Sequence, residues 1–198
     1  MVYYDWASRG NTKLGLVLCL HGLTGNGRFF DKLADALSDA GCRVVCPDIV
    51  GRGKSGWLKR PRDYNMQRYF SHLEVLINHL KVGEITLIGT SMGGGLGMML
   101  ASKAVTPVHR LILNDVGAVI PRGPMKYIRT YVEADPRFAD LEEVELYLRT
   151  IYAGAGSHET AQWKALAEIA SHRLEDGSYR LAFDPAISKS LRWLPPFS

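Results

Sequence analysis

The stretch that decides the fold is Glu84-Ile85-Thr86-Leu87-Ile88-Gly89-Thr90-Ser91-Met92-Gly93. Its first five residues are mostly apolar or β-branched and predict a buried strand, and the glycine- and leucine-rich run over 94–103 predicts a buried helix. A serine in G-x-S-x-G between a strand and a helix sits on a sharp turn with its hydroxyl exposed. Gly89 and Gly93 fit that turn, because it leaves almost no room for side chains on either side. We expect Ser91 to be a nucleophile.

Two backbone N–H groups are expected near this serine. The helix that begins at Met92 points its first N–H groups, and the positive end of its dipole, at charge developing beside Ser91. An earlier apolar run over 14–20 predicts a second strand, which leads into the glycine-rich loop His21-Gly22-Leu23-Thr24-Gly25. Such a loop can turn the N–H of Leu23 toward the serine. The sequence therefore predicts an oxyanion hole formed by Leu23 and Met92.

Strand and helix patterns alternate over the first 120 residues. Further strands are expected over 44–48 and 108–117, and amphipathic helices over 27–40 and 66–80. This alternation predicts an α/β fold with a mostly parallel sheet covered by helices on both faces. Ligands bind such sheets at the carboxyl ends of the strands. The residues expected at those ends are His21, Asp48, Ser91 and Asp115.

With these motifs in place, the chain resembles the α/β-hydrolases, the large group of esterases, lipases and carbon–carbon-bond hydrolases. The matching features are the His-Gly loop, the D-x-x-G-x-G-x-S loop over 48–55 and the G-x-S-x-G-G elbow, and the match is good over 14–121. The resemblance implies a serine-dependent hydrolase that cleaves an ester, thioester or similar carbonyl through an acyl-enzyme, without cofactor or metal. It also implies that His21 and Gly22 shape the oxyanion loop and that Asp48 holds loop backbone.

The resemblance further implies three regions. Residues 1–120 form the core, 121–190 a helical lid, and 191–198 the start of a return to the core. Within the lid we expect helices over 141–152 and 159–173 and no strand. Two more core strands would follow in the family, so we interpret the chain as the N-terminal part of the fold, with the C-terminal strands missing. The chain alone is then expected to be catalytically weak.

The partners of Ser91 are less well defined by the sequence. A serine needs a base, usually a histidine oriented by a carboxylate. His109, His158 and His172 follow Ser91, but none lies in the Gly-His turn that the family uses, and we interpret all three as structural or exposed. Asp115 is a possible acid, at a position that haloalkane dehalogenases use, or it caps the lid entrance. A dehalogenase itself is disfavoured, because its nucleophile would be an aspartate at position 91.

Two alternatives to a serine esterase remain open: a carbon–carbon-bond hydrolase of the same fold, and a ligand-binding relative that has lost catalysis. A dinucleotide site built from Gly93, Gly95 and Asp115 is disfavoured, because Met98 occupies the third glycine position of that motif. The substrate is expected to be a small molecule, mostly an apolar acyl compound or a ketone. Lid aromatics can line its pocket or serve as core: Tyr127, Tyr131, Tyr147, Tyr152 and Trp163.

Composition excludes several other classes. The 198 residues are 46% hydrophobic and 22% charged, with a net charge of +4, as in ordinary globular proteins. We expect a cytoplasmic protein without leader or membrane span, with three reduced cysteines and no nucleic-acid partner. A basic cluster at Arg52, Lys54, Lys59, Arg60 and Arg62 is interpreted as a solvated loop rather than a collar for an anionic substrate. Self-association is expected if 111–113 form an uncovered sheet edge.

Overall fold

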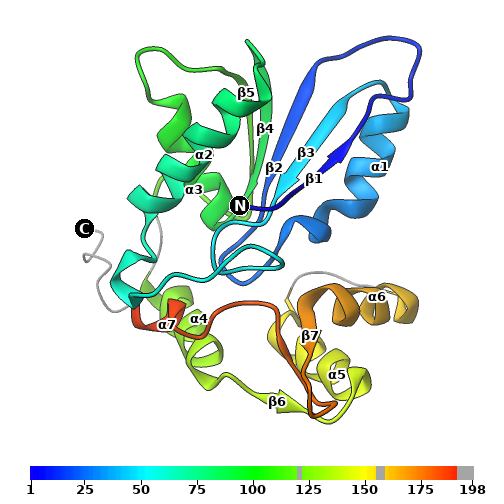
Figure 1. The fold of residues 1–198 in the computed structure, drawn as a ribbon, viewed down its shortest axis with the longest axis vertical. Helices are drawn as coiled ribbons and strands as arrows, with labels where there is room; N and C mark the ends of the chain where they lie inside the picture. Colours follow the sequence, from blue (N-terminus) through cyan, green and yellow to red (C-terminus); the bar gives the residue numbers. More distant parts are fainter. Residues whose placement is uncertain (120–121, 155–158, 191–198) are drawn as a thin grey trace.

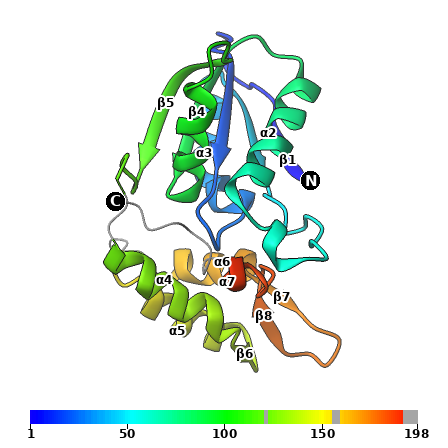
Figure 2. The same ribbon diagram turned by 90° about the vertical axis from the view of Figure 1, so that its left-hand side faces the viewer.

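The molecule has two parts, a sheet flanked by helices and a smaller group of helices and short strands at one end of that sheet (Figure 1). The computed structural model describes residues 1–119, 122–154 and 159–190, without the side chains of 122–127 and 190. Figure 2 shows the arrows of β2 and β5 pointing toward the smaller part. The carboxyl ends of the strands therefore face the lid that the sequence predicts.

The main sheet has five strands in the order β1-β3-β2-β4-β5. Their bounds are Tyr3–Trp6 for β1, Leu16–Leu20 for β2, Arg43–Pro47 for β3, Ile85–Thr90 for β4 and Val108–Asn114 for β5. Pairs among β3, β2, β4 and β5 are parallel, and β1 joins β3 antiparallel. The expectation of a mostly parallel α/β sheet is confirmed. Strand β1 was not predicted, because its four residues lack the length and apolar run of a buried strand.

Helices cover both faces of this sheet, as the sequence predicts. On one face, the short 3-10 helix η1 (Gly27–Phe30) and α1 (Asp31–Asp39) pack on Cys19, Val44 and Cys46. On the other face, α2 (Met66–Leu80) and α3 (Met92–Ala101) bury leucines against β2 and β4. A second 3-10 helix, η2 (Pro61–Asp63), precedes α2. All three cysteines are buried and unbridged, which fits the prediction of reduced thiols.

The second part is formed by residues from the region predicted as a lid, and it is not purely helical. Its helices are α4 (Arg122–Ala134), α5 (Leu141–Ile151), α6 (Thr160–Ala170) and α7 (Ile187–Ser190). A three-stranded sheet in the order β6-β8-β7 lies among them, formed by Arg137–Phe138, Tyr179–Leu181 and Ser171–Arg173. The prediction that this region contains no strand is wrong. Strands of two or three residues have no detectable periodicity, and the helix expected to reach residue 173 ends at Ala170.

Strand β5 is one edge of the main sheet in the described part of the chain. Leu111 packs against the core, whereas Ile112 is 50% exposed and Leu113 39% exposed. An edge strand with apolar, exposed side chains is available for further pairing.

None of the helices among the described residues is both long and apolar enough to cross a bilayer.

Candidate active site

Ser91 occupies the turn between β4 and α3 with a backbone φ of +49°. With a ψ of −113°, this sparsely populated conformation costs a residue with a side chain about 1–3 kcal/mol, so the surroundings must impose it. A Cβ at Gly93 would lie 2.1 Å from the Leu20 carbonyl oxygen, and a Cβ at Gly89 would lie 2.5 Å from the Gly93 oxygen. The Ser91 N–H donates to the carbonyl of Asn114, at 2.9 Å. The elbow is therefore held by close backbone packing against two neighbouring strands.

The loop after β2 approaches this elbow closely. A Cβ placed on Gly22 would lie 3.7 Å from the Cβ of Ser91, at van der Waals contact, so a methyl group would fill the space between the loop and the serine. Neither the N–H of Leu23 nor that of Met92 donates a hydrogen bond to any residue that the structure describes. Both residues are partly buried beside the serine. The chain thus brings the predicted oxyanion donors to the predicted nucleophile, with both N–H groups free.

His21 fixes the peptide that carries the Leu23 N–H. The Ile49 N–H donates to His21 Nε2 at 3.0 Å, so the proton of the ring is on Nδ1, which donates to the Gly22 oxygen at 2.7 Å. Burial lowers the pKa of His21 from 6.5 to about 3, and the ring stays neutral. The C=O and N–H of one trans peptide point in opposite directions. Holding the Gly22 oxygen therefore also orients the Leu23 N–H.

Asp48 ties the two loops at the carboxyl ends of β2 and β3 together. It is fully buried, and its carboxylate accepts hydrogen bonds from the N–H groups of Gly27 at 2.7 Å and Lys54 at 2.8 Å. The Tyr4 hydroxyl donates to it at 3.3 Å. Burial, and then this carboxylate, raise the pKa of Tyr4 to about 12. Asp48 bonds to loop backbone and not to Ser91.

Arg52 is the largest departure from the sequence-based expectations around the site. Lys54, Lys59, Arg60 and Arg62 are exposed, as expected of a solvated loop, but Arg52 is 0% exposed. The prediction for this one residue is wrong. Its guanidinium points inward and contacts two backbone carbonyls and an aromatic ring. These contacts compensate for the burial of the charge, and they cannot be inferred from the residue type alone.

We assign no catalytic base among the described residues, because none of their histidines forms a hydrogen bond with the Ser91 hydroxyl. His109 lies exposed near the start of β5, and the Nε2 of His172, in β7, lies 2.9 Å from the Gly53 oxygen. His158 lies outside the described residues. Asp115 directly follows β5 with a φ of +53° and is exposed. Because Asn114 pairs with Thr90 in the sheet, Asp115 and Ser91 are the next residues along the two neighbouring strands. No hydrogen bond joins the side chains of Asp115 and Ser91.

The predicted lid region contacts the loops that follow β2 and β3. Tyr64 donates a 2.5 Å hydrogen bond to buried Asp184, and burial together with this bond raises the Tyr64 pKa above its usual range. The hydroxyls of Tyr152 and Thr24 form a hydrogen bond of 3.3 Å.

Of the other aromatic residues expected near a substrate pocket, Trp163 is buried in the core cluster. Tyr131 and Tyr147 are partly buried against that cluster, and the side chain of Tyr127 lies outside the described residues.

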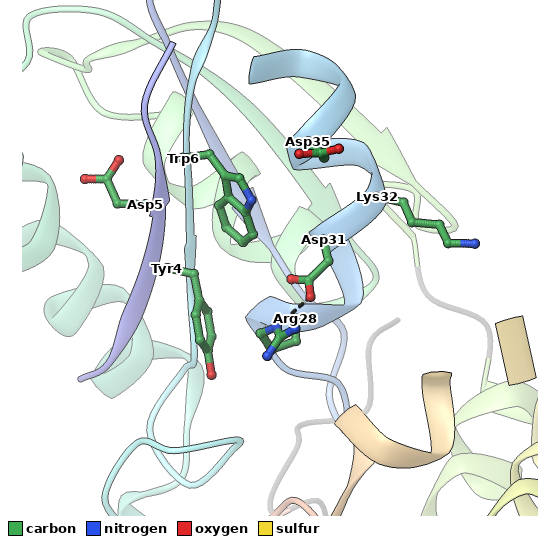
Figure 3. A pocket seen from close by; sticks show the side chains of 7 residues that line it. All are labelled: Tyr4, Asp5, Trp6, Arg28, Asp31, Lys32 and Asp35. Atoms are coloured by element: carbon green, nitrogen blue, oxygen red, sulfur yellow. Dashed lines mark hydrogen bonds and ion pairs between the residues drawn. The ribbon is translucent and has the colours of Figure 1, made fainter. Parts of the chain in front are cut away.

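A separate surface hollow of about 540 Å³ lies between β1 and α1 (Figure 3). Two of its carboxylates are in ion pairs: Asp31 with Arg28 at 2.5 Å, and Asp35 with Arg9 at 2.6 Å. The α1 face carries no residue of the elbow. In the described residues, no group of three or more histidine, cysteine or acidic side chains is arranged to hold a metal ion.

Comparisons with known proteins agree with this architecture. A family model of the alpha/beta hydrolase fold matches residues 15–162. A 3-hydroxybutyrate-oligomer hydrolase of Cupriavidus necator is 39% identical over 99% of this chain and 67% of its own length. A Rickettsia typhi structure is 34% identical with a TM-score of 0.88, covering 94% of this chain and 65% of that one.

An alpha/beta hydrolase structure from Novosphingobium aromaticivorans is 30% identical with a TM-score of 0.83. It covers 93% of this chain and 70% of that one. The chain therefore spans about two thirds of the length of the relatives it matches. The matched family region includes the loop after β2, the turn that carries Ser91 and most of the region predicted as a lid. The chain belongs to the alpha/beta hydrolase fold family.

Proposed function

We propose that this protein is a serine-dependent hydrolase that cleaves carboxylic esters, with Ser91 as its nucleophile. The observation that carries the proposal is the Ser91 turn itself, held at positive φ beside two free backbone N–H groups. Strain of this kind persists only where the surrounding structure imposes it, and it is concentrated at functional sites. A serine retained merely as a small residue would not require free donors on either side.

In the proposed reaction, the Ser91 Oγ attacks the ester carbonyl carbon and forms a tetrahedral intermediate. The negative charge on the former carbonyl oxygen is stabilised by the N–H groups of Leu23 and Met92, which need no reorganisation to receive it. Collapse of the intermediate expels the alcohol and leaves an acyl-enzyme, which water then hydrolyses to the acid and free Ser91. We place the general base outside the described residues, and Asp115 remains a possible acid.

The relative of Cupriavidus necator guides the choice of substrate class. Its name specifies oligomers of 3-hydroxybutyrate, whose units are joined by ester bonds, and it is similar to this chain over nearly all of the 198 residues. We propose short esters of hydroxy acids of this kind as the substrate. The partly buried tyrosines of the lid, Tyr131, Tyr147 and Tyr152, offer apolar rings with a polar end to such a molecule.

The test is hydrolysis of the 3-hydroxybutyrate dimer and trimer by the full-length protein, measured as release of the monomer. Ser91→Ala should abolish release, whereas Ser102→Ala, at the exposed end of α3, should leave it unchanged. A panel of p-nitrophenyl esters and a vinylogous diketone would be assayed in parallel. Cleavage of the diketone without esterase activity would replace the proposal with a carbon–carbon-bond hydrolase. Binding of the oligomer without turnover of any ester would favour a non-catalytic relative.

A further inference from the structure

Arg52 is a buried cation without an acidic partner. The guanidinium is 0% exposed, and it forms no ion pair with any residue that the structure describes. Its Nε–H donates to the Leu23 oxygen at 2.8 Å, and an Nη1–H donates to the Val50 oxygen at 2.9 Å. Its Cζ lies 4.7 Å from the centre of the Tyr69 ring. Burying a charge is costly unless it is hydrogen-bonded, so these contacts must hold Arg52 in one arrangement.

The same side chain contacts both residues of the proposed oxyanion hole. Besides the Leu23 carbonyl, its Nη2 lies 3.6 Å from the Met92 Sδ. Leu23 lies between two peptide groups, of which His21 holds the first through the Gly22 oxygen and Arg52 holds the second through the Leu23 oxygen. With both peptide planes fixed, the direction of the Leu23 N–H is fixed as well.

The backbone around Arg52 is in turn attached to the lid. The Gly53 N–H donates to the Ala182 oxygen and the Asp184 N–H donates to the Gly51 oxygen, each at 2.8 Å. Arg52 itself pairs with Phe183 in an isolated antiparallel bridge. These bonds place the segment that returns from β8 directly against the loop that carries Arg52. Residue 52 therefore contacts the segment after β8 through its backbone and the Leu23 carbonyl through its side chain.

We propose that Arg52 is a positioning residue that holds the Leu23 side of the oxyanion hole through its Nε–H hydrogen bond. The inference rests on the proposed esterase function. Arg52 does not contact substrate, because it is fully buried beneath the loop. It acts by keeping the Leu23 N–H aimed at the developing oxyanion before the reaction begins, and donors fixed in advance stabilise a transition state most effectively.

Three substitutions of Arg52 separate the effect of its hydrogen bond to Leu23 from the effect of its positive charge. In Arg52→Gln the side-chain amide nitrogen takes the place of Nε, so the donor to Leu23 is kept while the charge is lost. In Arg52→Lys the charge is kept but a methylene occupies that place, and Arg52→Met removes both. Arg62→Lys, at an exposed arginine of the same segment, is the matched control. The measurements are kcat and KM for p-nitrophenyl butyrate and the inhibition constant of a trifluoromethyl ketone, with thermal unfolding recorded for each protein.

We expect kcat to stay near the wild-type value in Arg52→Gln and to fall on the order of 10- to 100-fold in the lysine and methionine variants. KM should change little, and affinity for the ketone should fall in parallel with kcat. A lysine variant more active than the glutamine variant would overturn the inference in favour of a role for the charge. Lower thermal stability with unchanged kcat would overturn it in favour of a purely structural role.

The comparison remains decisive if Arg52→Met does not fold, because the order of the glutamine and lysine variants alone separates the two roles. Ser91→Ala is included in the same series. If Ser91→Ala is inactive and the expected order is absent, the inference about Arg52 fails while the proposed function stands. If Ser91→Ala retains activity, the proposed function fails, and the inference that rests on it fails with it.

Discussion

Replacing His21 with glutamine should remove a large part of the acid sensitivity of the folded protein. Burial lowers the pKa of His21 from 6.5 to about 3, the nearby Arg52 charge acts in the same direction, and only the hydrogen bond to Gly22 opposes them. The His21 ring therefore becomes protonated near pH 6.5 in the unfolded chain, but only near pH 3 in the folded chain. Stability must fall as the pH falls through that interval, at about 1.4 kcal/mol per pH unit.

Between pH 7 and pH 5 this one ring should cost about 2 kcal/mol of unfolding free energy. Glutamine can still accept the Ile49 N–H but does not titrate. We expect His21→Gln to be less stable than the wild type at pH 7, because the bond to the Gly22 oxygen is weakened. The difference should shrink by about 2 kcal/mol at pH 5. Urea unfolding at pH 7, 6 and 5 measures both quantities.

Exposed His109 supplies the matched control, and His109→Gln should follow the wild-type pH dependence. Burial also lowers the pKa of His72. That residue is present in all three proteins, so its contribution cancels in the comparison. If His21→Gln and the wild type lose stability in parallel from pH 7 to pH 5, His21 is not held neutral by burial. Its assignment as an Nδ1–H donor to the oxyanion loop would then be wrong.

Gly93→Ala should lower the unfolding free energy by about 3 kcal/mol in urea denaturation, because its Cβ would lie 2.1 Å from the Leu20 oxygen; an unchanged midpoint would contradict this packing. Gly22→Val should reduce kcat about 100-fold with little change in KM, by displacing the Leu23 N–H. Gly22→Ala should be nearly normal, since a methyl group fits 3.7 Å from the Ser91 Cβ, and equal turnover of the two variants would count against the oxyanion assignment. The 198-residue chain should associate, and Ile112→Lys should make it monomeric, because a charge on an exposed edge strand prevents pairing. Light scattering measures both masses. A wild-type chain that is already monomeric would refute the expected association.

The core could be predicted because its signals are local. Each parallel strand is a short apolar run, and the elbow needs residues without side chains two positions either side of Ser91, so glycine spacing marks it directly. Strand β1 and the three lid strands escaped prediction because two to four residues form a strand only when tertiary pairing supplies a partner. Local sequence does not contain that information.

Part of the candidate site could be predicted from the sequence in the same way. Leu23, Met92 and Ser91 follow from loop and elbow motifs, and the structure brings them together. Arg52 could not be identified, since an arginine in a basic loop is usually exposed. Its burial depends on two carbonyls and an aromatic ring contributed by separate elements. The nearest sequence signal is its place between Gly51 and Gly53, which frees the backbone to turn the side chain inward.

Covalent labelling is the direct test of Ser91 as the nucleophile. The full-length protein would be treated with a fluorophosphonate probe, digested, and mapped by mass spectrometry, alongside Ser91→Ala and the control Ser102→Ala. We expect one modified peptide, carrying the probe on Ser91, in the wild type and in Ser102→Ala, and no labelling of Ser91→Ala. Equal labelling of the Ser91→Ala variant, or a modified peptide that excludes residue 91, would contradict it.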